Sequence, residues 1–229
     1  NPGQNITITT LKATTTITST AGGVTTLTTV TSGGAINLTS GGNVNIVTLD
    51  SGANLTALST GGDVIGTTVN AGGNTSISGL GLGIQALSSL ASTFLTANGP
   101  PSLTDPYGGN IIVEGINNGV SGGVGVNVTA AANASIFVPV IVAKTGSIFL
   151  TAGQDIDVLA LAAGANISTT SINGVTNIVT AASSGAISMT GGQSITFRQI
   201  TAVGAGGDVN LVSTSGFVLG IPSLAATDY

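Results

Sequence analysis

The sequence predicts an all-β fold, a right-handed parallel β-helix (β-solenoid) with about 19 to 20 residues per turn. Three observations predict it. Glycines recur at regular intervals, the segments between them alternate apolar and polar residues, and charged residues make up only 5% of the 229-residue chain. Stacked, nearly identical turns require all three.

Regularly spaced glycines define the length of a turn. In the first part of the chain they are separated by 11, 8, 11, 9 and 11 residues, at Gly22, Gly33, Gly41, Gly52, Gly61 and Gly72. A second series, with separations of 7, 11, 10, 11 and 7 residues, runs through Gly146, Gly153, Gly164, Gly174, Gly185 and Gly192. Two unequal segments therefore form one repeat, and the whole chain would make about eleven turns, roughly 50 Å long at the usual strand spacing.

Alternation within each segment predicts strands. Ile36 and Leu38 flank Asn37, so one face of that segment is apolar and the other is polar. The same pattern occurs at Val44 and Ile46, Ile187 and Met189, Ile195 and Phe197, and Val209 and Leu211. Strands this short are unstable alone, so neighbouring turns must bury one another.

The composition fits such a stack. The 36 glycines suit corners that need positive φ or a close backbone approach. Eight acidic and three basic residues give a net charge of -5, and like charges repeated from turn to turn would repel. The negative charge also argues against a nucleic-acid partner, which would be held by its phosphates.

Missing residue types exclude several kinds of chemistry. The chain has no cysteine and no histidine, which removes thiol nucleophiles, imidazole bases and the usual zinc sites. We expect no enzymatic activity, no catalytic, cofactor-binding or metal-binding residues, and no cofactor. The lack of cysteine favours an exported protein. The longest apolar run, residues 134–143, is about half as long as a membrane span, so none is expected.

One segment departs from the repeat. Residues 1–79 are predicted to form turns of the β-helix, 80–110 an insertion, and 111–229 further turns of the same domain. Within the insertion, helical spacing predicts a short helix over Leu87, Leu90, Ala91, Phe94 and Leu95. Asn98 and Gly99 would end it, followed by a loop through Pro101, Pro106 and Tyr107. An irregular wide turn without a helix is the alternative.

Two stretches resemble a known family: "GGAINLTSGGNVNIVTLDSGANLTALSTGGDV" and "GSIFLTAGQDIDVLALAAGANISTTSINGVTNIV". They are similar to repeats of the filamentous haemagglutinin class of bacterial surface proteins, which are exported by two-partner secretion. The resemblance covers most of the chain except residues 80–110. It implies a long right-handed β-helix, an extracellular location on a bacterial cell surface, and adhesion to a host cell, a neighbouring cell or their glycans.

The family's secretion-recognition region is not evident, so the chain is expected to be an internal repeat portion. Both ends of a β-helix expose strand edges. The chain is therefore either a piece of a longer coil or a subunit that stacks end to end into a filament.

A β-helical carbohydrate-active enzyme is the first alternative function. Such enzymes need clustered acids, and Asp155 and Asp157 are the one close pair. On a strand both would point outward, roughly 6 to 7 Å apart, with no nearby base or aromatic platform. The simpler interpretation is a solvated strand face, with Asp50, Asp63 and Asp208 as isolated corner or face residues.

Ice binding and calcium binding are further alternatives. Threonine ladders order water on flat coils, and Thr-x-Thr triplets begin at Thr7, Thr16 and Thr26, but they fade beyond residue 31. Asp63 and Asp208 each lie in a Gly-Gly-Asp-Val sequence, which lacks the rest of the calcium-binding nonapeptide.

Glycosylation is an open question. Asn-x-Ser/Thr triplets occur at Asn5, Asn37, Asn54, Asn74, Asn127, Asn133 and Asn166. In a chain rich in asparagine and threonine such triplets also arise by chance. The three basic residues, Lys12, Lys144 and Arg198, show no partner pattern and are expected to be solvated.

Overall fold

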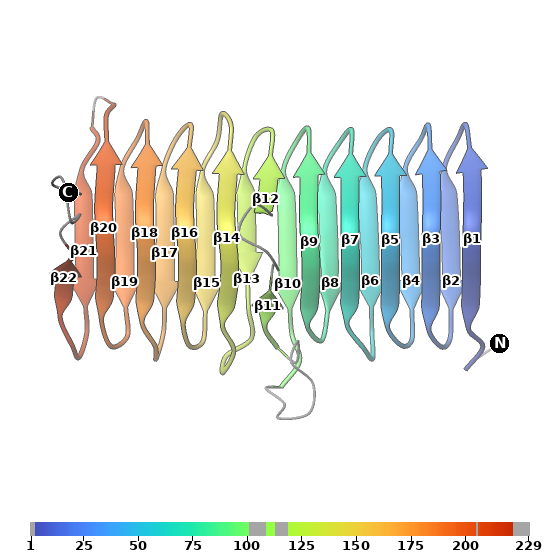
Figure 1. Cartoon of the computed structure of the whole chain (residues 1–229), viewed down its shortest axis with the longest axis horizontal. Coiled ribbons are helices and arrows are strands. Elements are labelled where there is room, and N and C mark those ends of the chain that lie inside the picture. The colour runs from blue at the N-terminus through green and yellow to red at the C-terminus, as the bar shows by residue number, and fades with distance from the viewer. Residues whose placement is uncertain (1–2, 101–108, 113–118, 205, 222–229) are drawn as a thin grey trace, which may run out of the picture.

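The computed structural model describes residues 3–100, 109–112, 119–204 and 206–221. Within these ranges the chain forms strands and no helix, and the strands build one continuous coil (Figure 1). Each strand pairs in parallel with the equivalent strand of the next turn. The predicted parallel β-helix is confirmed.

Each regular turn contributes one long and one short strand to two different sheets. The long-strand sheet comprises β1 (Ile6–Ala13), β3 (Thr25–Ser32), β5 (Val44–Ser51), β7 (Val64–Ala71), β9 (Leu82–Ser89), β11 (Ile111–Ile112), β12 (Gly119–Gly122), β14 (Ile136–Ala143), β16 (Ile156–Ala163), β18 (Thr176–Ser183), β20 (Ile195–Ala202) and β22 (Val218–Gly220). The short-strand sheet comprises β2 (Ile17–Ala21), β4 (Ile36–Ser40), β6 (Leu55–Ser59), β8 (Thr75–Gly79), β10 (Thr93–Ala97), β13 (Val126–Thr129), β15 (Ile148–Ala152), β17 (Ile167–Ser171), β19 (Ile187–Gly191) and β21 (Val209–Ser213).

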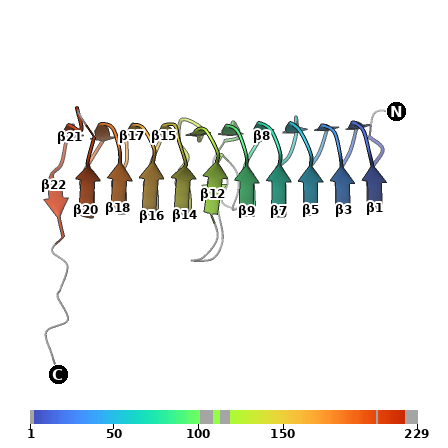
Figure 2. The same cartoon turned by 90° about the horizontal axis from the view of Figure 1, so that it is seen from above.

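The β-helix is right-handed. In Figure 1 the long strands run upward on the near side, and the chain returns through the short strands behind them. Successive turns advance from the blue N-terminal end to the red C-terminal end. Figure 2 shows the two rows of strands from above, on opposite sides of the coil.

Each long strand bends near its middle because the alternation is interrupted there. In β5, Val44 and Ile46 are buried, the next two residues, Val47 and Thr48, are both at least partly exposed, and Leu49 is buried again. Two successive outward residues turn the chain. Each turn therefore has three faces: the two halves of the long strand and the short strand.

Columns of apolar side chains fill the interior. Leu49, Val69 and Leu87 are in register on three successive turns and are almost completely buried. Burying a side chain of this size stabilises a protein by roughly 1.5 to 3 kcal/mol. Each copy covers the next, which is why strands of five to eight residues are stable here.

Serines and glycines shape the corners between strands. Ser51, Ser59 and Ser89 end strands inside the coil, and their hydroxyls donate to corner carbonyls of the preceding turn at 3.1, 2.8 and 2.7 Å. At Gly33 an added Cβ would lie 2.6 Å from the carbonyl oxygen of Thr14. Most corner glycines are therefore needed because the backbones of neighbouring turns approach closely, and not because the residue adopts a positive φ. Among the described glycines, positive φ occurs at Gly3, Gly109 and Gly206.

The helix expected over residues 87–95 is absent, and that prediction was wrong. Leu82–Ser89 and Thr93–Ala97 instead form β9 and β10, in register with β7 and β8. Of the residues assigned to the helix, Leu87 and Leu95 are buried on β9 and β10, whereas Leu90 is 68% exposed at the corner between these strands. Two short strands joined by a corner therefore gave the spacing of a helix. Phe94, assigned to the helix's apolar face, points outward from β10.

Regular turns therefore extend to Ala97, and the irregular part begins later in the chain than predicted. The next turn of the long-strand sheet is divided between β11 and β12, which both pair with β9 on one side and β14 on the other. The sheet continues through this turn, as expected for a single domain. The predicted loop through Pro101, Pro106 and Tyr107 lies outside the described residues.

Candidate functional site

Each acid of the Asp155 and Asp157 pair is hydrogen-bonded to the next turn. Asp155 is half-buried at a corner before β16, and its carboxylate accepts a hydrogen bond from the backbone N–H of Val175 at 2.8 Å. Asp157 is exposed on β16 and accepts a bond from the side chain of Asn177 at 3.1 Å. The expectation that both acids point outward to solvent was therefore wrong for Asp155, because its oxygen completes the backbone pairing of the next turn.

The remaining acids considered from the sequence are also dispersed. Asp50 accepts a hydrogen bond from the side chain of Asn70 at 2.7 Å. Asp63 is buried, and its carboxylate accepts the backbone N–H of Gly81 at 2.8 Å. Asp208 is exposed. Across the described ranges, no three acidic side chains gather in a way that would hold a metal ion.

Four asparagines of the Asn-x-Ser/Thr triplets have a role at corners. The side-chain oxygens of Asn5, Asn54, Asn74 and Asn166 accept backbone N–H groups one turn later, at 2.8 to 3.0 Å. This corner position needs a short side chain with an acceptor oxygen. That need explains why asparagine is frequent there without invoking glycosylation. All seven triplet asparagines are exposed nevertheless. The three basic residues are exposed as expected.

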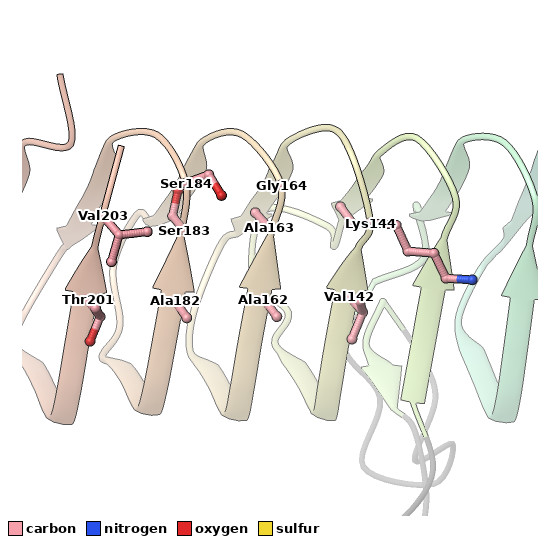
Figure 3. Close-up of a pocket in the computed structure, with 11 residues that line it drawn as sticks. Val142, Lys144, Ala162, Ala163, Gly164, Ala182, Ser183, Ser184, Thr201 and Val203 are labelled. Atoms are coloured by element: carbon pink, nitrogen blue, oxygen red, sulfur yellow. The ribbon is translucent and has the colours of Figure 1, made fainter. Parts of the chain in front are cut away.

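Two separate hollows lie over the second halves of the long strands. Figure 3 shows the C-terminal one, a hollow of about 330 Å³ floored by Val142, Ala162, Ala182 and Thr201. The side chain of Lys144 extends from its rim toward the N-terminal turns. No carboxylate lines this hollow, so it lacks the acid pair that glycoside hydrolysis requires.

The N-terminal hollow is more polar. It measures about 460 Å³ and is lined by Thr31, Asp50, Asn70 and Ser88, among others. These residues are in register with one another and, through Ser121, with Val142. One strip of the coil therefore changes from polar to apolar along its length.

The outward face of the short-strand sheet carries two rows of side chains, and the ten short strands contain no charged residue. We define the mixed row as Thr18, Asn37, Thr56, Ser76, Phe94, Asn127, Phe149, Ser168, Ser188 and Asn210. The threonine row is Thr20, Thr39, Leu58, Ser78, Thr96, Thr129, Thr151, Thr170, Thr190 and Val212.

The threonine row is the feature that the sequence analysis missed. Five consecutive turns place a threonine at the same position, from Thr96 to Thr190. The Thr-x-Thr triplets suggested from the sequence lie elsewhere: Thr7 and Thr26 belong to long strands. An alignment of the fourth residue of each short segment would have found the row. The irregular turn between Thr96 and Thr129 breaks the regular repeat length on which such an alignment depends.

The fold defines this chain as a β-solenoid repeat protein. No protein-family model matches it, and no curated protein or solved structure shows significant similarity to it. The described residues include no helix long and apolar enough to cross a membrane. Function must therefore be inferred from the surface itself.

Proposed function

We propose that this chain is an extracellular structural and adhesive β-solenoid of a bacterial cell surface, a stalk or fibre segment that contacts a host cell, a neighbouring cell or their glycans. The observation that carries the proposal is the uncharged, regularly repeated face of the short-strand sheet. Ten turns at the ordinary strand spacing extend roughly 48 Å. Such a rod both spans distance and presents the same groups repeatedly.

The construction suits a role outside the cell. Each turn is bonded to the next through backbone groups, with corner side chains such as Asn54 and Asp155 adding bonds where the strands end. Proteases need an extended, locally opened chain, and this coil has few segments without neighbours on both sides. The resemblance to filamentous haemagglutinin repeats supports the same location and role.

Surface labelling tests this proposal. Antiserum against the chain is expected to label intact cells of the source bacterium, and brief protease treatment of those cells should remove the signal. Labelling that appears only after the cells are permeabilised would contradict an extracellular role. A cytoplasmic marker protein, which must stay unlabelled on intact cells, provides the control.

End-to-end association belongs to the same proposal. Within the described residues β1 and β22 stand at the two ends of the long-strand sheet, each paired on one side, and an unpaired strand edge is a template for another strand. Sedimentation velocity at increasing concentration should show growing rods. A single monomeric species at all concentrations would remove the filament component.

Ice binding is a second candidate that one observation favours. Threonines occupy the same register position on five successive turns, from Thr96 to Thr190. Ice-crystal growth in the presence of the chain tests it: shaped crystals would support ice binding, and unaltered growth would exclude it. The neighbouring mixed row carries two phenylalanines, which roughen the face and favour adhesion over ice.

A further inference from the structure

Two exposed phenylalanines stand out on the uncharged face. Phe94 and Phe149 belong to the mixed row, are 45% and 48% exposed, and lie on either side of Asn127 in the register. At two strand spacings their backbones are roughly 9 to 10 Å apart. Each exposed aromatic ring offers a large apolar surface that a ligand can cover.

The two rings border a hollow. It measures about 260 Å³, and its lining includes Phe94, Phe149, Val124, Gly125 and Gly146. Gly125 and Gly146 lie at the corners that precede β13 and β15. The backbone carbonyl of Gly125 is already bonded to the N–H of Thr93 at 2.9 Å, so the floor of the hollow is part of the regular coil and is formed before any ligand binds.

Polar groups without charge lie beside the rings. Asn127 is exposed between them, and Thr96, Thr129 and Thr151 face outward two residues further along the same strands, about 7 Å away. An amide and three hydroxyls offer both donors and acceptors. The residues that line the hollow include no charged side chain.

We propose that Phe94, Asn127 and Phe149 form a binding site for a neutral polysaccharide. The apolar C–H face of a pyranose ring packs against an aromatic ring, while the sugar hydroxyls hydrogen-bond to amide and threonine groups. A polymer lying along the mixed row would meet Phe94, Asn127 and Phe149 in turn. This inference rests on the proposed adhesive function and specifies its ligand.

The charge of the chain selects against other polymers. A net charge of -5 and an uncharged site offer nothing to attract sulfated or carboxylated polysaccharides, and the same argument disfavours nucleic acid. Binding is therefore expected to change little with salt concentration, since no ion pairs are formed.

The test compares binding of the full chain to soluble neutral polysaccharides (dextran, a mixed-linkage β-glucan and galactomannan) with binding to alginate, by affinity electrophoresis and calorimetry. We expect at least one neutral polymer to bind and alginate not to bind. Phe94→Ala and Phe149→Ala should each weaken binding about tenfold, as expected for loss of one aromatic contact, and Phe94→Tyr should preserve it.

Phe137→Ala is the matched control. Phe137 is 39% exposed, but it lies on β14 in the long-strand sheet, so its removal should leave binding unchanged. All variants should keep the circular dichroism and unfolding midpoint of the original chain, since the three rings are largely outside the core.

Three results would overturn the site: no binding to any neutral polymer, preferential binding to alginate that falls with salt, or equal loss in Phe137→Ala and Phe149→Ala. The adhesive function is judged separately by surface labelling. A chain that is found on the cell surface but binds no neutral polysaccharide refutes this site alone.

Discussion

The carboxylate of Asp155 accepts a hydrogen bond from the backbone N–H of Val175, 20 residues and one turn later, at 2.8 Å. Asn54 makes the equivalent bond to Asn74 at 2.9 Å, and Asn166 makes it to Ala186 at 2.9 Å. Corners interrupt the strand pairing, and these side chains supply the missing acceptor. Aspartate and asparagine are interchangeable there because only the oxygen is used.

This equivalence leads to a prediction at Asp155. Replacing Asp155 by Ala leaves a half-buried N–H without its acceptor and should lower the free energy of unfolding by about 1 to 2 kcal/mol. Asp155→Asn keeps the oxygen and should change it by less than about 0.5 kcal/mol. Urea unfolding followed by circular dichroism measures both. Equal loss in the two variants would mean that the negative charge, rather than the hydrogen bond, matters.

A second prediction concerns corner glycines. In Gly33→Ala the new Cβ would meet the carbonyl of Thr14 at 2.6 Å, so the stacked corners must separate, at a cost of about 1 to 3 kcal/mol. Gly66→Ala is the control: its Cβ would lie 3.2 Å from a methyl group of Val69, which can shift, and the expected change is below about 1 kcal/mol. Thermal unfolding distinguishes them. Similar midpoints for both variants would contradict the close-approach explanation.

The third prediction compares two leucines. Leu49 is fully buried in the apolar column, whereas Leu90, at a corner, is 68% exposed. Leu49→Ala should destabilise the coil by about 2 to 5 kcal/mol because it leaves a cavity. Leu90→Ala should stay within about 0.5 kcal/mol. If Leu90→Ala proved as damaging as Leu49→Ala, another surface would have to cover Leu90 in solution.

A fourth prediction addresses catalysis. Asp155 is hydrogen-bonded to the backbone of Val175 at a corner, and Asp157 is hydrogen-bonded to the side chain of Asn177 on the sheet. We expect no release of reducing ends from neutral or acidic polysaccharides by the original chain or by the double variant Asp155→Asn and Asp157→Asn. Turnover by the original chain that disappears in the double variant would establish the enzyme alternative.

The alternation of apolar and polar residues predicted the regular turns well, because it indicates which side of each strand faces the core. Ile36, Val44, Ile187 and Ile195 are all buried, as that pattern requires. It failed where two structures share a spacing. Leu87 and Leu90 are three residues apart, as on a helix, but Leu87 is buried on β9 and Leu90 is exposed at the corner that follows it. Sequence alone does not separate such a corner from a helical turn.

The amino-acid order by itself determined the coil, since glycine spacing and two-residue periodicity are properties of each turn taken alone. The tertiary structure decided which side chains of one turn are stacked on which side chains of the next. Phe94 and Phe149 are 55 residues apart in the sequence, and only the stacking register, carried across the irregular turn by β10, β13 and β15, places them beside Asn127. Side chains that are distant along the chain become neighbours because hydrogen bonds between successive turns set the register of the stack.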